Sequence, residues 1–370
     1  MFALFANTKT QLQPITQLDQ TSSPPIVFQT PYYISPDLKQ SAMANEEARL
    51  SLDLSLYEDS PDQDDIFCKS LLQSLADGTK EPADAAHELD AWVTRESTRL
   101  LEEFRAKPEL VKKDDSDNTV HRATTPNASG LVERFFQGFP RLCAIFPPHH
   151  PGQTRVIEFL KALLAMPQHN APDSFPDADD LSNVTMMTLW PRGVIEPDTF
   201  RIYDAELTSV GERAELEMPG SEGSARWRNY QAALARITMS GFTDCSFLCG
   251  LRDILPQGSG GKKAAKCPTP KVVCGTRPAD IGNRLRAAVQ WLVVGSEEED
   301  GGEEGARWVY ERCRAKEKTD GASDPWDTWS RENWETWKVQ LAFYEGDDRV
   351  ELWAREAARN ALLRMKAAEP

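Results

Sequence analysis

Apolar residues along most of this chain recur every three or four positions, which is the spacing of one face of an α-helix. The clearest example lies near the C-terminus, between a candidate N-cap at Ser330 and a break at Gly346. Its apolar stripe consists of Trp334, Trp337, Leu341 and Tyr344. Because an apolar stripe of this kind is normally covered by other apolar surface, we expect this helix to pack against a neighbour.

A second helix is expected directly after this break, starting with Asp348 and Glu351 in an arrangement that resembles a capping box. Its apolar face consists of Val350, Trp353, Ala354, Ala357, Ala361 and Met365. The alanines allow a partner helix to approach closely, and the indole rings fill the remaining space. Each large apolar side chain that is fully buried contributes about 1.5–3 kcal/mol. We therefore predict that this Trp-rich helical hairpin closes the core of the protein.

The same helical period recurs in a series of segments before the hairpin. They cover residues 64–78, 82–92, 97–110, 129–146, 151–167, 224–241, 244–256, 278–292 and 306–316. Ser129 is the expected N-cap of the fourth segment, which Gly138 and Pro140 are expected to break or kink. Alternating runs of β-branched residues are almost absent. The predicted fold class is therefore all-α, an irregular multi-helix bundle or array of roughly nine to eleven helices.

The chain divides into a polar N-terminal part and one helical domain. Residues 1–60 are rich in Gln, Thr, Ser and Pro and are expected to be mostly disordered, and translation could begin at Met1 or at Met43. Residues 61–370 are expected to form a single all-helical domain. Its polar, glycine-rich and proline-rich stretches predict exposed loops near residues 112–126, 168–222, 256–277 and 295–305. Within 168–222 we expect irregular structure with at most one short helix.

Charge and composition narrow the functional class. The formal net charge is −16, which disfavours nucleic acid as a partner because acidic surfaces repel phosphate. No apolar run is long enough to span a bilayer, and the first fifteen residues lack the basic region and apolar core of a signal peptide. Seven cysteines in a chain of this length are best explained as reduced thiols. We therefore expect a cytoplasmic, or alternatively nuclear, protein without a membrane partner.

Four cysteines raise the possibility of a structural zinc site. Cys245 and Cys249 are four positions apart on the predicted helix 244–256, and Cys267 and Cys274 follow it. Their spacing matches none of the common zinc-binding patterns, so buried or free thiols are the favoured interpretation. No metal or other cofactor is expected.

Two further patterns could carry chemistry. His149 and His150 form a tandem pair in a proline-rich turn, but no carboxylate lies at helical spacing from them, so a role at the start of the next helix is favoured over a catalytic base. Residues 258–263 lack the first glycine and the final Ser or Thr of a phosphate-binding loop. The lysines of this region suggest an exposed loop, or else a site for an acidic partner or for nuclear import. They are Lys262, Lys263, Lys266 and Lys271.

Two motifs support a resemblance to a known family. Residues 227–236 follow the pattern W-x-N-x-x-A-x-L-A-R, and Trp334 and Trp337 form a W-x-x-W pair in the predicted hairpin. Together they resemble a fungal, ascomycete family of all-helical proteins of unknown function, over residues 62–368. Residues 168–222 depart most from the family pattern. The resemblance implies a helical fold and a cytoplasmic or nuclear location, and it transfers no catalytic residue.

The favoured function is a non-enzymatic one, in which the helical protein acts as an interaction or scaffold module for a protein partner. This choice rests on the lack of a recognisable catalytic motif in the sequence. The alternative is an enzyme or a small-molecule-binding protein with a helix-lined pocket. Such a protein could be auxiliary to secondary metabolism. The candidate pocket residues are His150, Trp227, Arg236, Arg252 and Trp337.

Overall fold

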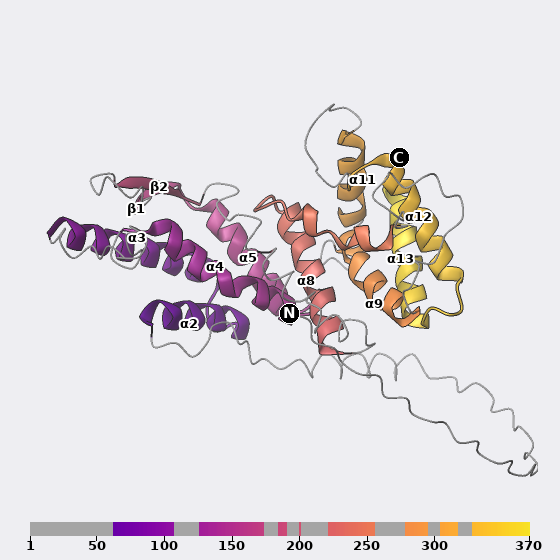
Figure 1. Ribbon diagram of the computed structural model, residues 1–370, viewed down its shortest axis with the longest axis horizontal. Helices are drawn as coiled ribbons and strands as arrows, with labels where there is room; N and C mark the ends of the chain where they lie inside the picture. Colours follow the sequence, from indigo (N-terminus) through magenta and orange to yellow (C-terminus); the bar gives the residue numbers. More distant parts are fainter. Residues whose placement is uncertain are drawn as a thin grey trace, which may run out of the picture. The chain divides into compact units, whose positions relative to one another are not determined.

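The computed structural model describes residues 62–106, 126–173, 184–190, 200, 221–255, 278–294, 304–316 and 328–370. The described residues belong to one compact unit, Glu46–Pro370, and contain ten α-helices and one two-stranded sheet (Figure 1), which confirms the all-α class. Residues 1–60, the loop predicted at 256–277 and most of the loops predicted at 112–126 and 295–305 lie outside this part. No described helix is both long and apolar enough to cross a membrane.

Four helices pack together in the first half of the described chain. They are α2 (Gln63–Asp77), α3 (Pro82–Ala106), α4 (Ala128–Ile145) and α5 (Pro151–Ala165). The N-cap of α2 is Asp62, and α2 ends at Gly78, whose φ of 69° lies in the left-handed region that glycine reaches without strain. Pro82 and Pro151 start their helices, as the sequence predicts.

The structure differs from the predictions for this group in three details. The segments predicted at 82–92 and 97–110 form one 25-residue helix, α3, because Ser97 is buried and its hydroxyl bonds back to the carbonyl of Thr94 instead of starting a new helix. Helix α4 also continues through Pro140, since it is packed on almost every side. Its N-cap is Asn127, not Ser129, because the Asn127 side chain accepts the N–H of Gly130 at 3.0 Å.

A small sheet replaces the irregular structure expected in the first part of 168–222. Strand β1 (His169–Asp173) pairs antiparallel with β2 (Thr185–Leu189), so that Ala171 lies opposite Met187. Strand β1 contacts α3 and α4, and Ala171 of β1 and Leu189 of β2 are buried. The described part of this region is therefore a strand pair whose first strand packs on the helices, while most of β2 is exposed.

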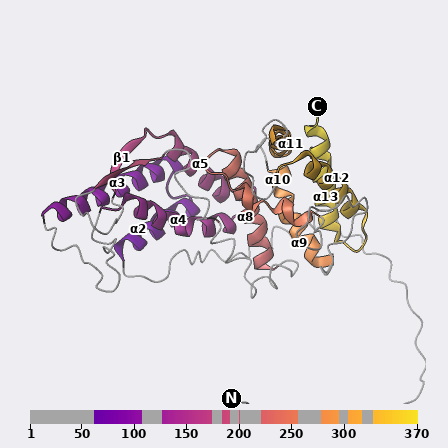
Figure 2. The ribbon, with the colours of Figure 1, turned by 45° about the horizontal axis from the view of Figure 1, so that its top comes forward.

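Helix α8 (Glu222–Met239) lies between two groups of helices, as Figures 1 and 2 show from two directions. It contacts α4 and α5 of the first group. It also contacts three helices of the second group, which are α9 (Pro278–Ala288), α10 (Gln290–Val293) and α11 (Glu304–Lys316). The buried apolar side chains form one cluster from Cys68 in α2 to Ala368 in α13, and α8 lies within it.

The predicted helix at 244–256 is absent. Two 3-10 helices, η3 (Ser246–Leu248) and η4 (Gly250–Ile254), take its place, so Cys245 and Cys249 do not share an α-helix. The backbone comes close to other elements at Gly250, where an added Cβ would lie 3.1 Å from Gln231 Oε1 and 3.3 Å from the Cα of Ala288. This close approach explains the interruption.

The C-terminal hairpin consists of α12 (Arg331–Gly346) and α13 (Leu352–Ala368), and it confirms the main sequence prediction. The whole predicted stripe of α12 is buried, and Ser330 is the N-cap. The capping box was wrong, because the N-cap of α13 is Glu351 and no side chain bonds the helix start there. The buried face of α13 is also rotated slightly from the prediction, and Trp353 and Ala357 are only half-buried. The observed buried face of α13 consists of Ala354, Ala358, Ala361, Leu362, Met365 and Ala368.

Candidate functional site

Helix α8 carries a row of polar side chains that are buried yet hydrogen-bonded to neighbouring elements. Asn229 donates from Nδ2 to the carbonyls of Ala144 and Ile145, both at 3.1 Å, at the C-terminal end of α4. Its Oδ1 accepts from Nε of Arg228 at 3.0 Å and from Nη2 at 2.8 Å. Since the last carbonyls of a helix lack partners within the helix, Asn229 caps α4 from outside.

A second buried amide joins α8 to the start of α5. Nε2 of Gln153 donates to the carbonyl of Phe146 at 3.1 Å and to that of Asn229 at 3.2 Å. Its Oε1 accepts from Nη1 of Arg236 at 3.4 Å. Both hydrogen-bonding ends of the Gln153 amide are therefore paired within the protein.

Gln231 connects α8 to the opposite group of helices. Its Oε1 accepts the N–H of Gly250 at 2.9 Å and the indole N–H of Trp291 at 2.8 Å, while Nε2 donates to the carbonyl of Leu248 at 3.1 Å. One buried side chain therefore holds η3, η4 and α10 against α8. We call Gln153, Asn229, Gln231 and Trp291 the α8 network.

The predicted pocket residues fall at different places around this network. His150 and Arg236 meet at the start of α5, where Nδ1 of His150 accepts the N–H of Gly152 at 3.0 Å and Arg236 reaches Thr154 Oγ1 at 3.4 Å. His150 is the N-cap of α5, which confirms its favoured role at a helix start. Its ring stacks on Phe146 with centroids 5.0 Å apart.

The other three candidates lie on three different elements, Trp227 on α8, Arg252 in η4 and Trp337 on α12. Nη1 of Arg252 donates to the carbonyl of Phe247 at 2.8 Å, and the buried indole of Trp337 donates to the carbonyl of Leu251 at 2.9 Å. Trp227 is buried on α8, with its ring centroid 6.4 Å from that of Tyr230. The described bonds of Arg252 and Trp337 hold the main chain of η3 and η4, and Trp227 packs within the core.

Sequence reasoning missed a polar contact that fixes the sheet to α3. Oδ1 of Asp90 lies 2.6 Å from Nε2 of His169 on β1 and accepts the indole N–H of Trp190, also at 2.6 Å. Trp190 is buried with a φ of 60°, a conformation that a bulky residue rarely adopts without support from its surroundings. No local sequence signal joins Asp90 to residues 79 and 100 positions away.

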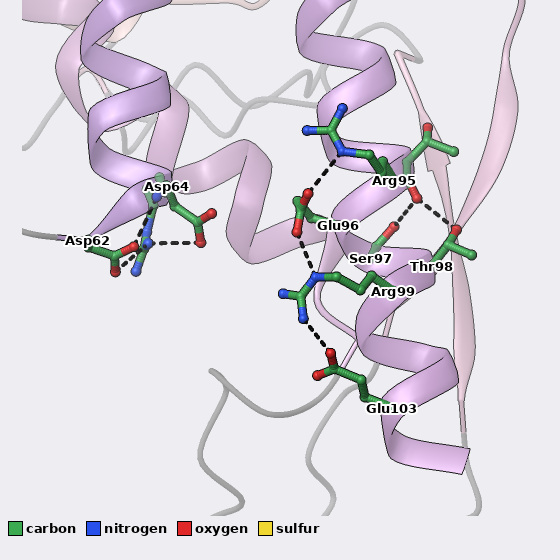
Figure 3. Close-up of polar contacts among 10 residues, drawn as sticks. Asp62, Asp64, Arg95, Glu96, Ser97, Thr98, Arg99 and Glu103 are labelled. Atoms are coloured by element: carbon green, nitrogen blue, oxygen red, sulfur yellow. Dashed lines mark hydrogen bonds and ion pairs between the residues drawn. The ribbon is translucent and has the colours of Figure 1, made fainter. Parts of the chain in front are cut away.

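The second half of α3 carries an exposed row of alternating charges (Figure 3). Arg95 contacts Glu96 at 3.0 Å, Glu96 contacts Arg99 at 2.9 Å, and Arg99 contacts Glu103 at 2.8 Å. The pKa of Glu96 is lowered, because these arginines outweigh the opposing effect of its partial burial. The pairs three and four positions apart, Glu96–Arg99 and Arg99–Glu103, stabilise an exposed helix by about 0.2–0.5 kcal/mol each.

A second charged group lies at the start of α2, where Arg134 contacts Asp62 at 2.9 Å and Asp64 at 3.1 Å (Figure 3). The pKa of Asp62 is lowered, first by the N–H of Asp64 that it caps and also by Arg134. The pKa of Asp64 is raised, because burial outweighs the attraction of Arg134. This group ties the start of α2 to α4.

The buried cysteines have the properties of structural thiols. Burial raises the pKa of Cys143, Cys245 and Cys249, which keeps them protonated and poorly nucleophilic at neutral pH. Among the described residues, no three His, Cys, Asp or Glu side chains are placed to hold a metal ion. Cys267 and Cys274, the other members of the zinc hypothesis, lie outside these residues.

The hairpin carries three exposed large apolar side chains. Leu352 and Leu363 of α13 are 48% and 58% exposed, and Val339 of α12 is 51% exposed. Arg359 and Glu345 join the two helices here, at 2.8 Å. We call the exposed residues Leu352, Glu356, Arg359 and Leu363 the outer stripe of α13, because their spacing of four, three and four positions follows one face of the helix.

The helices that carry the α8 network fall within the match of one family model. The chain is a member of the family described as "Protein of unknown function (DUF3632)", whose model matches residues 142–341. The match is shorter than the range 62–368 over which a resemblance was expected, but it contains every residue of the α8 network. No curated protein and no solved structure matches the chain.

Proposed function

We propose that this protein is a non-enzymatic helical scaffold that binds a protein partner through the outer side of the α12–α13 hairpin. The observation that carries the proposal is the exposure of Val339, Leu352 and Leu363, which are three of the five exposed large apolar side chains among the described residues. Leu352 and Leu363 lie on one face of α13 with Glu356 and Arg359 between them, and exposed apolar side chains flanked by charges are typical of a protein-binding surface. A net charge of −16 favours a protein partner over nucleic acid.

The α8 network supports a structural role for the motif that the sequence singles out. Asn229 and Gln231 belong to the W-x-N-x-x-A-x-L-A-R segment, and their amides pair with backbone groups of α4, η3 and η4. A buried polar group that is fully bonded makes a fold more specific and rigid. A rigid scaffold can present a docking surface at low entropic cost.

The buried thiols support a cytoplasmic or nuclear location, which we propose as part of this function. Cys143, Cys245 and Cys249 are free and buried. Free thiols persist in reducing compartments, whereas exported proteins more often pair their cysteines.

Site-specific photo-crosslinking tests the proposed surface. A benzophenone amino acid is placed at Leu363, which is 58% exposed, or at Ile66 of α2, which is 47% exposed and serves as the control. The proposal expects one protein to be crosslinked in stoichiometric amount from position 363, with capture lost when Leu352 is also changed to Lys and no such product from position 66. Equal labelling from both positions, or capture that persists after Leu352→Lys, would contradict it.

A further inference from the structure

The outer stripe of α13 is symmetric in its spacing, and its two central charges are opposite, so the stripe is complementary to its own reverse along the helix. Its order is Leu352, Glu356, Arg359 and Leu363, so an apolar residue lies at each end and two opposite charges lie in the middle. All four side chains are exposed. The midpoint of the stripe falls between Glu356 and Arg359.

The distances along the helix axis make this pattern self-complementary. With a rise of 1.5 Å per residue, Leu352 and Leu363 each lie about 8 Å from the midpoint, and Glu356 and Arg359 each lie about 2 Å from it. When two such helices cross antiparallel about a two-fold axis at the midpoint, each leucine meets the other leucine of the second copy. Each Glu356 then meets an Arg359, and the symmetry produces every contact twice.

From this arrangement we infer that the partner of the outer stripe is a second copy of this chain, joined through an antiparallel α13–α13 contact. The inference rests on the proposed function, because it names the protein that the hairpin binds. The internal bond between Arg359 and Glu345 is compatible with it. A guanidinium has five N–H donors, and Arg359 is largely exposed, so it can bond both carboxylates.

The charges of the stripe also fix the direction of the contact. In a parallel pair about an axis along the helices, Glu356 would meet Glu356 and Arg359 would meet Arg359, and like charges at an interface suppress that arrangement. An antiparallel pair replaces both repulsions with attractions. The stripe therefore selects one symmetric dimer.

Charge reversal tests this dimer without any knowledge of another partner. The full chain is prepared as wild type, as Glu356→Arg and as Arg359→Glu, with Glu102→Arg as an exposed charge reversal on α3. Sedimentation at a concentration on the order of 100 µM measures the mass against 41.5 kDa for one chain. We expect dimers for wild type and Glu102→Arg, and at least about tenfold weaker self-association for each of the other single variants.

The decisive sample is an equimolar mixture of Glu356→Arg and Arg359→Glu. Each variant alone brings like charges together, but a mixed pair restores both opposite-charge contacts, so the mixture should regain the dimer. Circular dichroism of each variant checks that it is folded. A monomeric wild type, or a mixture that stays monomeric while the wild type is a dimer, overturns the inference. A monomeric wild type that still yields a specific crosslinked protein from position 363 would leave the proposed function standing.

Discussion

Gln231 and Trp291 are joined by a buried hydrogen bond of 2.8 Å, from the indole N–H to Oε1 of the amide, across 60 positions of the sequence. The same oxygen accepts the N–H of Gly250, at the point where the predicted helix 244–256 is interrupted. The Gln231 side chain therefore bonds both to α10 in the core and to the backbone at Gly250, between the two short helices η3 and η4.

Replacement of Gln231 by leucine should destabilise the protein strongly. The substitution keeps most of the volume but leaves the N–H of Gly250, the indole N–H of Trp291 and the carbonyl of Leu248 buried without this partner. Each buried polar group left unsatisfied costs about 1–3 kcal/mol, and the costs are not fully additive, so we expect a loss of about 3 kcal/mol. Urea unfolding followed by tryptophan fluorescence measures this loss. The control Gln73→Leu, whose exposed bond is to Asp77, should change stability by less than about 0.5 kcal/mol.

Loss of the Asp90 carboxylate should loosen the small sheet. Asp90→Leu removes the partner of His169 and of the Trp190 indole, so the support for the unusual Trp190 conformation weakens. We expect amides of β2 to exchange with solvent about tenfold faster, while α12 keeps its protection. Asp84→Leu, at an exposed position in the first turn of α3, is the control. Unchanged exchange in β2 would show that the sheet is held by its apolar contacts alone.

The buried thiols should resist alkylation in the native protein. Because burial raises the pKa of Cys143, Cys245 and Cys249, iodoacetamide at pH 8 should modify them only when the structure opens. Mass spectrometry of peptides after timed labelling, with a urea-unfolded sample as the reference, measures this protection. Rapid native labelling of Cys249 would mean that η3 and η4 open far more easily than the α8 network implies.

The contact between Glu369 and α12 should depend on pH. Lys338 and the Trp334 indole hold the pKa of Glu369 below its usual value. A carboxyl group with a lowered folded-state pKa contributes stability above its unfolded-state pKa, and this contribution is lost as the pH falls through the folded-state value. Glu369→Gln should therefore be less stable than wild type at pH 7 by about 0.5 kcal/mol, a small effect because the carboxylate lies at the surface and is partly exposed to solvent.

The same difference should shrink between about pH 5 and pH 3, as the wild-type carboxyl group takes up a proton. Urea unfolding at a series of pH values measures this stability difference. Salt at 0.5 M should reduce the difference, because the Debye screening length is then on the order of a few ångströms. Glu332→Gln, an exposed change in the first turn of α12, is the control. A difference that grows as the pH falls would contradict the assigned sign.

The helical period predicted most of the fold because a buried helix face leaves a direct trace in the sequence. Trp334, Trp337, Leu341 and Tyr344 are buried together as expected. The period failed where distant contacts decide local structure. Leu248, Leu251 and Leu255 are spaced as in a helix, yet the backbone at Gly250 is held by Gln231. Strand β1 contains Pro172 and lacks apolar alternation, so only its pairing with β2 and its packing on α3 reveal it.

The candidate site was less predictable than the fold. The motif around Trp227 was visible in the sequence, but the roles of Asn229 and Gln231 depend on which backbone groups lie opposite them. Asp90 and His169 are 79 positions apart, and neither lies in a recognisable pattern. The outer stripe of α13 was hidden for another reason. The helical period predicts which residues of α13 are buried, but it says nothing about the order of the exposed residues.

The central claim is that α8 joins the two groups of helices into one cooperative structure. Hydrogen exchange under native conditions, at increasing urea concentration, tests it by comparing the slowest amides of α4 and α12 in wild type and in Asn229→Ala. This variant loses the two bonds from Asn229 to carbonyls of α4 and the two bonds that Asn229 accepts from Arg228 of α8, and none of these bonds reaches α12. The account predicts that the unfolding free energy falls by the same amount, about 2 kcal/mol, in both helices. A loss confined to α4, with α12 unchanged, would contradict it.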